Sequence, residues 1–314
     1  MMSMRAARIH TYGDAGVFVY EDSPRPTAGE GEVLIKVHAT TVNRFDGAAR
    51  AGYMTGWYTY TFPMILGLDV AGIVEQVGAG VTSFAPGDAV MARTDPARNG
   101  AYAEYVAVPA SEVAMKPASL DYLQAAALPH VGLTAWRALI EAANLSSGQT
   151  VLIHAAAGGV GSFAIQLAKW RGAKVIGTAS AHNHDFIREL GADEVIDYTA
   201  TPFENVVRDV DVVFDTVGGD TQDRSWQVLK PGGILVSIVQ PPSEDAAAKH
   251  GVRQQFVGAF PPASGPLNEI AALVNTGHIK PVVSSIFPIQ EIQKAHELVD
   301  GAHNKGKLVL QVVN

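Results

Sequence analysis

One glycine-rich turn holds the clearest chemical potential in the sequence. The residues His154-Ala155-Ala156-Ala157-Gly158-Gly159-Val160-Gly161 follow a strand-like run, TVLI, and open a helix-like run, SFAIQLAKWRG. In such a turn, small residues let the backbone approach a pyrophosphate, and the helix N-terminus faces its negative charge. Gly158 and Gly161 take the last two glycine positions of G-x-G-x-x-G, with Ala156 at the first. The turn predicts a dinucleotide site; a tight turn of another α/β fold is the alternative.

The strand after this turn indicates which dinucleotide is bound. The run KVIGTAS ends at Ser180, and no Asp or Glu follows until Asp185. A carboxylate here normally accepts hydrogen bonds from the adenosine ribose, and it would repel a 2′-phosphate. Ser180 is followed instead by His182, His184 and Arg188, so we expect NADPH rather than NADH. The alternative is that the histidines are solvated surface residues; a metal pair lacks a further ligand at the right spacing.

Two kinds of predicted elements position this turn. Residues 5–110 are mostly strand patterns between turn signals, with a short helix over 44–52. Helical spacing over 120–146 is interrupted at Pro129, and strands then alternate with helices, including a helix over 221–230 and a strand over 233–239. This alternation predicts right-handed crossovers and a parallel, doubly wound sheet. Two more helices precede a last strand, KLVLQVV, which can return to the first part.

Composition excludes several classes of protein. The 314 residues suffice for two domains, and a net charge of −8 argues against binding to nucleic acid or to an anionic membrane. With no cysteine, there is no disulfide, thiol nucleophile, iron–sulfur cluster or thiolate zinc site. The N-terminal residues MMSMRAARIHTYG contain no apolar signal segment, so we expect a soluble, cytoplasmic protein.

Ordered motifs along the chain carry a family resemblance. They run from GEVLIKVHATTVNRFDGAARAG through GLDVAGIVEQVGAGV, PGDAVMA, GAYAEYVAVPA, AAALPHVGLTAWRAL, the glycine-rich turn, GADEVIDY and VVFDTVGG to GKLVLQVV. Together they resemble the medium-chain dehydrogenase/reductase superfamily, in its zinc-free quinone oxidoreductase (zeta-crystallin-like) branch. The resemblance implies an α/β fold with a GroES-like β-rich catalytic domain over 1–122 and 265–314. It also implies an inserted Rossmann-type, doubly wound parallel sheet over 123–264, with cofactor and substrate between the domains.

Departures from the zinc alcohol dehydrogenases of that superfamily indicate the reaction. Those enzymes use an early Cys, a His-Glu pair after a Gly, and a later Cys. The matching positions here are Asn43 and Leu68-Asp69 after Gly67, so we expect no metal. Without a Lewis acid to form an alkoxide, alcohol oxidation is disfavoured, and hydride transfer to a quinone or an enone fits better. The alternative is a non-catalytic NADPH-binding protein of the crystallin type, with a zinc alcohol dehydrogenase as a distant third.

Three residues are the candidate catalytic groups. The family's glycine-plus-tyrosine pattern falls on Gly52-Tyr53, and the Tyr53 hydroxyl can donate to a substrate oxygen; packing under a surface loop is the alternative. Asn43 is a candidate partner of the nicotinamide ribose or the substrate. Asp46 is a site residue or a helix cap. The five aromatics of segment 53–62 form a substrate wall or pack as a loop, and His130 is a further, weaker candidate.

The resemblance also implies cofactor contacts and a partner. The cofactor-binding residues are Thr134, Ala155, Gly158, Gly159, Val160, Gly161, Ser180, His184, Tyr198 and Lys307. Tyr198 falls in the family's Ile-x-Tyr position, where it can stack or hydrogen-bond near the phosphate. The family usually has Lys where His184 stands, which predicts a weaker preference for NADPH that sharpens at low pH. Members commonly form homodimers by edge pairing of the Rossmann sheets, expected here around 234–239.

Overall fold

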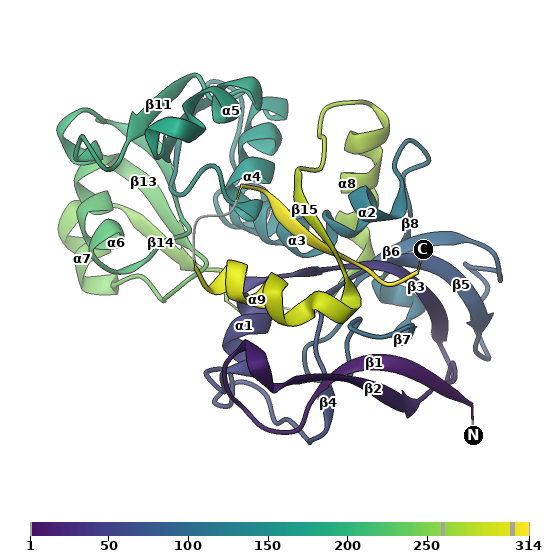
Figure 1. The fold of residues 1–314 in the computed structure, drawn as a ribbon. Coiled ribbons are helices and arrows are strands. Elements are labelled where there is room, and N and C mark those ends of the chain that lie inside the picture. Colours follow the sequence, from purple (N-terminus) through teal and green to yellow (C-terminus); the bar gives the residue numbers. More distant parts are fainter. Residues whose placement is uncertain (1, 259–260, 302–304, 314) are drawn as a thin grey trace. The chain divides into compact units, whose positions relative to one another are not determined.

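The computed structural model describes residues 2–258, 261–301 and 305–313. Its chain divides into two compact units. Unit 1 comprises Met1–His130, Pro261–Gly277 and Pro281–Asn314, and unit 2 comprises Val131–Phe260 and His278–Lys280. Both ends of the chain therefore belong to unit 1 (Figure 1). The predicted fold class, a β-rich unit with an inserted parallel α/β unit, is confirmed.

Unit 1 is built on a seven-stranded sheet in the order β15-β16-β3-β5-β6-β8, with β7 also paired to β3. These strands are β3 (Glu32–Val42), β5 (Asp69–Val77), β6 (Ala89–Arg93), β7 (Tyr105–Pro109), β8 (Val113–Met115), β15 (Val283–Pro288) and β16 (Lys307–Gln311). The last strand returns to the first part as predicted, because β16 pairs antiparallel with β3 and sets Leu308 opposite Val42. This register brings Lys307 to the end of β3, beside Asn43.

In the described part of the chain, unit 1 also has a smaller sheet and four α-helices. The sheet has the order β2-β1-β4 and comprises β1 (Ser3–Ile9), β2 (Phe18–Pro24) and β4 (Met64–Ile65). The helices are α1 (Arg44–Arg50), α2 (Tyr122–Ala126), α8 (Ser264–Asn275) and α9 (Ile292–Asp300). The apolar face of α9 packs with β1, β4 and the end of β16 in one buried cluster. Helices α1 and α9 contact each other, and Ala49 of α1 belongs to the same buried cluster. The core of unit 1 therefore holds α1 in place.

Unit 2 is a six-stranded parallel sheet in the order β11-β10-β9-β12-β13-β14. Its strands are β9 (Thr150–Ile153), β10 (Lys174–Ala179), β11 (Glu194–Asp197), β12 (Val210–Asp215), β13 (Leu229–Ser237) and β14 (Arg253–Phe256). Its helices include α3 (Pro129–Trp136), which begins in unit 1, α4 (Gly159–Trp170), α5 (His184–Glu189), α6 (Gly219–Ser225) and α7 (Glu244–His250). Counted from β9, this is the dinucleotide-binding order, whose direction reverses between β9 and β12.

Two details of unit 2 differ from the sequence prediction. The helix expected over 221–230 ends at Ser225, and Leu229 and Lys230 already belong to β13. Pro231 accounts for this, because a residue before proline is driven out of the helical region. The polar run RQQF of β14 was not predicted as a strand. This run is held by pairing with β13. The segment 234–239, which is expected at the edge of the sheet, has its strand residues in β13, and β13 lies between β12 and β14. The predicted edge was wrong, and β14 takes that place.

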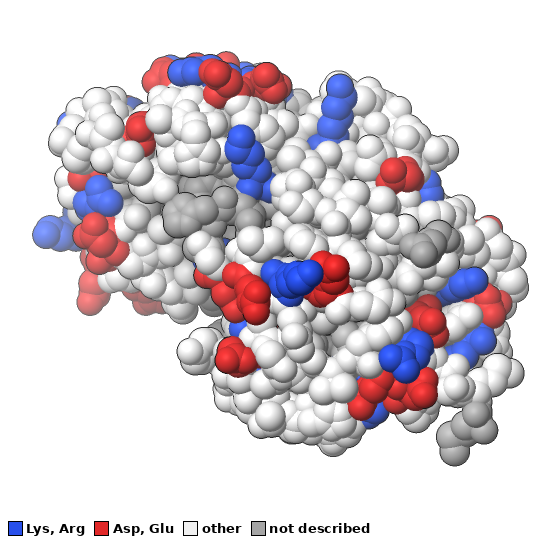
Figure 2. Space-filling view, in the orientation of Figure 1, with Lys and Arg blue, Asp and Glu red and all other residues white. Residues whose placement is uncertain are grey.

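Two features of the structure concern possible binding to membranes or nucleic acids: the apolar segments and the charges on the surface. The apolar stretch 151–168 contains most of the strand β9 and most of the helix α4. In the described part of the chain, no helix combines the length and the apolar character that crossing a bilayer requires. On the face drawn in Figure 2, lysine and arginine are interspersed with aspartate and glutamate over both units rather than gathered in one basic patch.

Candidate functional site

The glycine-rich turn of unit 2 joins β9 to α4. Ala155 adopts a left-handed conformation with φ of 45°, and its N–H donates to Thr178 Oγ1 at 3.3 Å. Gly158 is the N-cap residue of α4. A Cβ on Gly161 would lie 2.5 Å from the Ala155 oxygen and 2.7 Å from the Ala156 Cα, so only glycine fits. The first-turn N–H groups of α4 lack intrahelical partners, so the turn fits a pyrophosphate.

The buried His154 connects this turn to two neighbouring elements. His154 Nε2 lies 2.9 Å from Ser225 Oγ, and Nδ1 lies 3.2 Å from Thr178 Oγ1. Because the Ser225 hydroxyl donates to the Thr221 oxygen at 2.7 Å, we assign the His154 proton to Nε2, which leaves Nδ1 to accept from Thr178. Burial lowers the pKa of His154 to about 4. A neutral imidazole therefore links β9, β10 and α6 behind the turn, a role that the motif alone did not indicate.

The candidate 2′-phosphate residues gather where β10 and β11 end. The register pairs Ala179 with Asp197, so Ser180 and Tyr198 follow on neighbouring strands. Ser180 Oγ accepts from Asn183 Nδ2 at 3.2 Å, and His184 Nε2 lies 3.3 Å from the Ala179 oxygen. Tyr198 is 51% exposed. The structure thus brings Ser180, His184 and Tyr198 to one edge of the sheet.

Two further residues concern the predicted cofactor site: a carboxylate beside Ser180, His184 and Tyr198, and a predicted cofactor residue that lies elsewhere. Asp197 is a carboxylate that the sequence prediction did not weigh. Hydrogen bonds from Thr199 hold the pKa of Asp197 below its usual value, with smaller contributions from His184 and His182. Thr134 is buried within α3 and lies on an element separate from these strands.

In unit 1 the start of α1 holds two of the predicted catalytic residues together. Asn43 precedes α1, and its backbone N–H donates to Asp46 Oδ2 at 2.9 Å. The Asn43 Nδ2 donates to Asp46 Oδ2 at 3.1 Å and to Asp69 Oδ2 at 3.0 Å. Asp46 is therefore a helix cap that also belongs to a polar cluster. Burial raises its pKa to about 6, against the opposing effect of the hydrogen bonds from Asn43.

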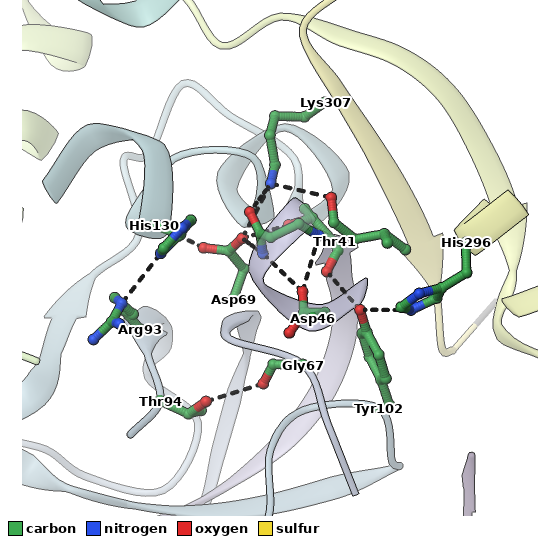
Figure 3. Close-up of polar contacts among 12 residues, drawn as sticks. Thr41, Asp46, Gly67, Asp69, Arg93, Thr94, Tyr102, His130, His296 and Lys307 are labelled. Atoms are coloured by element: carbon green, nitrogen blue, oxygen red, sulfur yellow. Dashed lines mark hydrogen bonds and ion pairs between the residues drawn. The ribbon is translucent and has the colours of Figure 1, made fainter. Parts of the chain in front are cut away.

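Asp69 and Lys307 form a buried ion pair within the same cluster. Lys307 Nζ lies 3.4 Å from Asp69 Oδ2, 3.5 Å from the Val42 oxygen, and in hydrogen-bond contact with Asn43 Oδ1. The Thr41 hydroxyl also donates to Asp69 Oδ2. Burial alone would raise the pKa of Asp69, but Lys307 and the other donors hold it below its usual value. Figure 3 shows Lys307, Thr41, Asp46 and Asp69 converging from β16, β3, α1 and β5.

His130, the weaker sequence candidate, belongs to this cluster. Its backbone N–H donates to Asp69 Oδ1 at 2.6 Å. Arg93 Nε, which can only donate, lies 3.2 Å from His130 Nδ1, so we assign the ring proton to Nε2. Burial and the Arg93 charge lower the pKa of His130 to about 3. The ring is therefore neutral at any pH near neutrality.

A second chain of contacts, which the sequence did not indicate, reaches the cluster from α9. Asp300 binds Arg50 Nη2 at 2.8 Å, and Arg50 Nη1 lies 3.0 Å from His296 Nδ1. His296 Nε2 lies 3.2 Å from the Tyr102 hydroxyl. Burial raises the pKa of Tyr102 well above its usual value, and the Asp46 carboxylate adds to this. This series of contacts thus ends at Asp46. Its members are far apart in sequence, so no local pattern indicates them.

Tyr53 lies outside this cluster. It follows α1 on the loop that begins at Gly52, whose φ is 86°, and its side chain is 80% exposed. The aromatic segment 53–62 combines both alternatives, since Tyr58 and Tyr60 pack while Trp57 is 61% exposed. A shallow hollow, open to solvent, is lined by Phe45, Asp46, Tyr60, Ile65, Leu66, Gly67, Leu68, Thr94, Asp95, Pro96, Arg98 and Gly100. The structure brings Asn43, Asp46 and Lys307 together, and it leaves Tyr53 on an exposed loop.

Buried histidines make the fold sensitive to acid. The pKa of His154 is about 4, and burial helped by Arg50 lowers that of His296 to about 3. His130 is likewise neutral in the fold, with a pKa of about 3. Unfolding restores all three to about 6.5, so the unfolded chain binds about three more protons near pH 5. Asp46, with a folded pKa of about 6, offsets up to one of them. We expect stability to fall by about 2.7 kcal/mol per pH unit below pH 6.

Urea unfolding at pH 7, 6 and 5 measures this slope. A His250→Ala variant removes an exposed histidine at the end of α7 and should keep the same slope. Stability that is constant or that rises toward pH 5 would contradict the assignment of neutral, buried His130, His154 and His296.

Comparison with known proteins gives a consistent result. Residues 29–118 match the alcohol dehydrogenase GroES-like domain, and residues 190–310 match the zinc-binding dehydrogenase family. The mitochondrial NAD(P)H oxidoreductase RTN4IP1 of Mus musculus is 39% identical over 90% of this chain and 82% of its own. The chloroplastic NADPH-dependent alkenal/one oxidoreductase of Arabidopsis thaliana is 34% identical over 98% of this chain and 79% of its own.

The zinc ion in the name of one matched family does not fit this chain. Asn43, Leu68 and Asp69 stand at the ligand positions named above, and the sequence has no cysteine. The ammonium of Lys307 already binds two of these residues. Across residues 2–258, 261–301 and 305–313, no three His, Cys, Asp or Glu side chains are grouped so as to hold a metal ion.

Solved structures agree with the sequence matches. The quinone oxidoreductase from Coxiella burnetii superposes with a TM-score of 0.92 at 35% identity, covering 99% of this chain and 100% of its own. The two matched domains, the close relatives and this superposition confirm the resemblance that the motifs indicated. The chain belongs to the medium-chain dehydrogenase/reductase superfamily of oxidoreductases, among relatives that include quinone oxidoreductases.

Proposed function

We propose that this chain is a zinc-independent, NADPH-dependent reductase that transfers hydride to a quinone or to an α,β-unsaturated carbonyl compound. The observation that carries the proposal is the cluster of Asn43, Asp69 and Lys307, in which a lysine ammonium is bound at metal-ligand positions. A saturated ammonium supplies charge but no open coordination position, so it cannot convert an alcohol to an alkoxide. An acceptor that is already polarised needs no such activation. The names of the Arabidopsis and Coxiella relatives support the same two substrate classes.

NADPH, when bound, supplies the hydride, and the chain's residues bind and orient it. The turn from Ala155 to Gly161 would hold the pyrophosphate, with backbone contacts from Ala155, Gly158, Gly159, Val160 and Gly161. Ser180, His184 and Tyr198 would hold the 2′-phosphate, and Thr134 would contact the cofactor from α3. Lys307 would act through Asn43, because its three donors already face oxygen atoms.

The substrate side of the reaction requires a donor and a proton. Hydride transfer to a β-carbon places negative charge on the carbonyl oxygen, which must find a hydrogen-bond donor. We assign this donor to the Tyr53 hydroxyl, which is exposed and available in the free protein. Asp46 fixes Asn43 at the edge of the site, and the aromatic segment 53–62 would contact a flat acceptor. Both N–H bonds of the Asn43 amide already donate to Asp46 and Asp69, so a backbone N–H is the next candidate donor.

The direct test is oxidation of NADPH with a panel of enones and quinones. Turnover with at least one acceptor is expected, and addition of EDTA should not change the rate. Tight NADPH binding with no turnover on any acceptor would instead support the non-catalytic, crystallin-type alternative. Stoichiometric zinc in the purified protein would revive the alcohol dehydrogenase alternative.

Cofactor preference gives an independent prediction. We expect NADPH to bind at least tenfold tighter than NADH, a difference of about 1.4 kcal/mol. His184→Ala should remove most of that preference by weakening NADPH binding alone, because NADH has no 2′-phosphate.

Isothermal titration with both cofactors measures this preference. His250→Ala, at the exposed end of α7, is the matched control and should leave it intact. Equal affinities for the two cofactors from pH 6 to pH 8 would overturn the assignment of Ser180 and His184.

The assembly of the chain also stays a proposal. We propose a homodimer formed by edge pairing of the unit 2 sheets. The edge involved would be β14 rather than β13, because β13 is paired on both sides. Light scattering that gives the mass of one chain at micromolar concentration would contradict this.

A further inference from the structure

Lys307 has a complete set of oxygen partners inside unit 1. Its side chain is 6% exposed, and its ammonium faces Asn43 Oδ1, Asp69 Oδ2 at 3.4 Å and the Val42 oxygen at 3.5 Å. An ammonium has three N–H donors, so each has an acceptor. A buried lysine is rare unless it is paired. The ammonium is therefore a fixed cation surrounded by three oxygen atoms (Figure 3). We call these oxygens, from Val42, Asn43 and Asp69, the cage.

Two of the three residues that surround the ammonium stand where metal ligands stand in the zinc-dependent members. Asn43 takes the place of the early Cys, and Asp69 takes the second place of the His-Glu pair that follows Gly67. Lys307 comes from 264 residues away, and it reaches the cage because β16 pairs with β3 directly before Asn43. The cation is thus brought to this place by the fold of unit 1 itself.

The cage depends on a positive charge. Asp69 is fully buried and accepts hydrogen bonds from Asn43 Nδ2, from the Thr41 hydroxyl and from the His130 backbone N–H. These donors are neutral, and the second carboxylate, Asp46, lies 3.1 Å from the same Asn43 amide. Removing the ammonium would leave Asp69 uncompensated and Asn43 Oδ1 without its partner, which is costly in a buried site.

We propose that the Lys307 ammonium is a built-in cation that permanently takes the place of the metal ion of the zinc-dependent members. By binding Asn43 Oδ1, it fixes the carboxamide with its NH2 group toward Asp46 and Asp69. Lys307 is therefore a positioning residue that acts through Asn43. This inference rests on the contacts and the family, so it is testable without NADPH or any substrate.

The test removes the ammonium and returns it as a free ligand. Lys307→Ala deletes the cation together with most of its alkyl chain, and the melting temperature should fall by about 10 °C. Propylammonium chloride should then raise the melting temperature of this variant saturably and recover at least half of the loss. Tetramethylammonium chloride, which has the charge but no N–H donor, should not do so at equal ionic strength.

Two controls separate this effect from general salt or amine effects. Wild-type protein has its own ammonium and should show no specific response to propylammonium. Lys174→Ala removes an exposed lysine that pairs with Glu194 at 2.6 Å, and its melting temperature should neither fall appreciably nor respond to the amine. If the chain has the proposed reductase activity, propylammonium should also raise kcat of Lys307→Ala at least tenfold and leave wild-type kcat unchanged.

A second pair of variants decides the matter if Lys307→Ala does not fold. Lys307→Met leaves Asp69 charged, whereas Lys307→Met combined with Asp69→Asn removes both charges, so the double variant should melt at the higher temperature. An equal or lower value would overturn the proposal. So would a Lys307→Ala variant that responds equally to both ammonium salts, or a wild-type protein that binds one zinc ion per chain. Absence of reductase turnover would refute the proposed function alone.

Discussion

Tyr53→Phe should lower turnover about a hundredfold or more and leave NADPH affinity nearly unchanged. The variant deletes one hydroxyl from an exposed loop residue, so the fold should be unaffected. Charge that develops on the acceptor oxygen then loses its donor, and loss of one such donor costs about 2.7–4 kcal/mol of barrier. The hydroxyl is not expected to touch the dinucleotide. Steady-state kinetics and NADPH titration of the same preparation measure both quantities.

Tyr58→Phe is the matched control for this experiment. Tyr58 belongs to the same aromatic segment but packs against Phe45, with ring centroids 5.8 Å apart. Its hydroxyl has no assigned part in the reaction, so its turnover should stay close to that of the wild type. If Tyr53→Phe keeps more than a third of wild-type turnover, the donor is elsewhere. A backbone N–H and ordered water are then next in line.

Gly161→Ala should abolish measurable NADPH binding. The added methyl group would lie 2.5 Å from the Ala155 oxygen and 2.7 Å from the Ala156 Cα, both of them backbone atoms that cannot rotate away. The first turn of α4 must therefore shift against β9, which moves the N–H groups proposed to bind the pyrophosphate. We expect the Kd for NADPH to rise more than a hundredfold and stability to fall by about 1–3 kcal/mol.

Gly265→Ala is the control for this variant. Gly265 lies in the first turn of α8, a helix of the same 12-residue length as α4, and a Cβ there meets nothing within 4 Å. It should bind NADPH with wild-type affinity. A Gly161→Ala protein that binds NADPH within threefold of the wild type would show that the pyrophosphate lies elsewhere.

Local patterns predicted the parts of this protein that local sequence determines. The turn from His154 to Gly161 is recognisable because small residues, a strand and a helix follow one another without a gap. The return of β16 to the first unit followed from its apolar, β-branched composition and its terminal place. Lys230 was assigned to a helix although Pro231 drives it toward an extended conformation.

The polar cluster of unit 1 could not be predicted in the same way. The resemblance places Lys307 at the cofactor, and nothing in its neighbourhood in sequence indicates Asp69, 238 residues away. Arg50 and His296 are 246 residues apart and meet because α1 packs on α9. Asp46 had two alternatives, cap or site, and the structure shows that one carboxylate both caps α1 and joins the cluster. Such contacts depend on tertiary packing.

The most direct test of the proposal that this chain needs no metal ion is the rate of NADPH oxidation before and after exhaustive chelation. Metal content is measured on the same sample. The assay should use the best quinone or enone acceptor of the panel. We predict an unchanged rate and far less than one zinc ion per chain. Loss of turnover on chelation, with recovery when stoichiometric zinc is restored, would contradict the proposal.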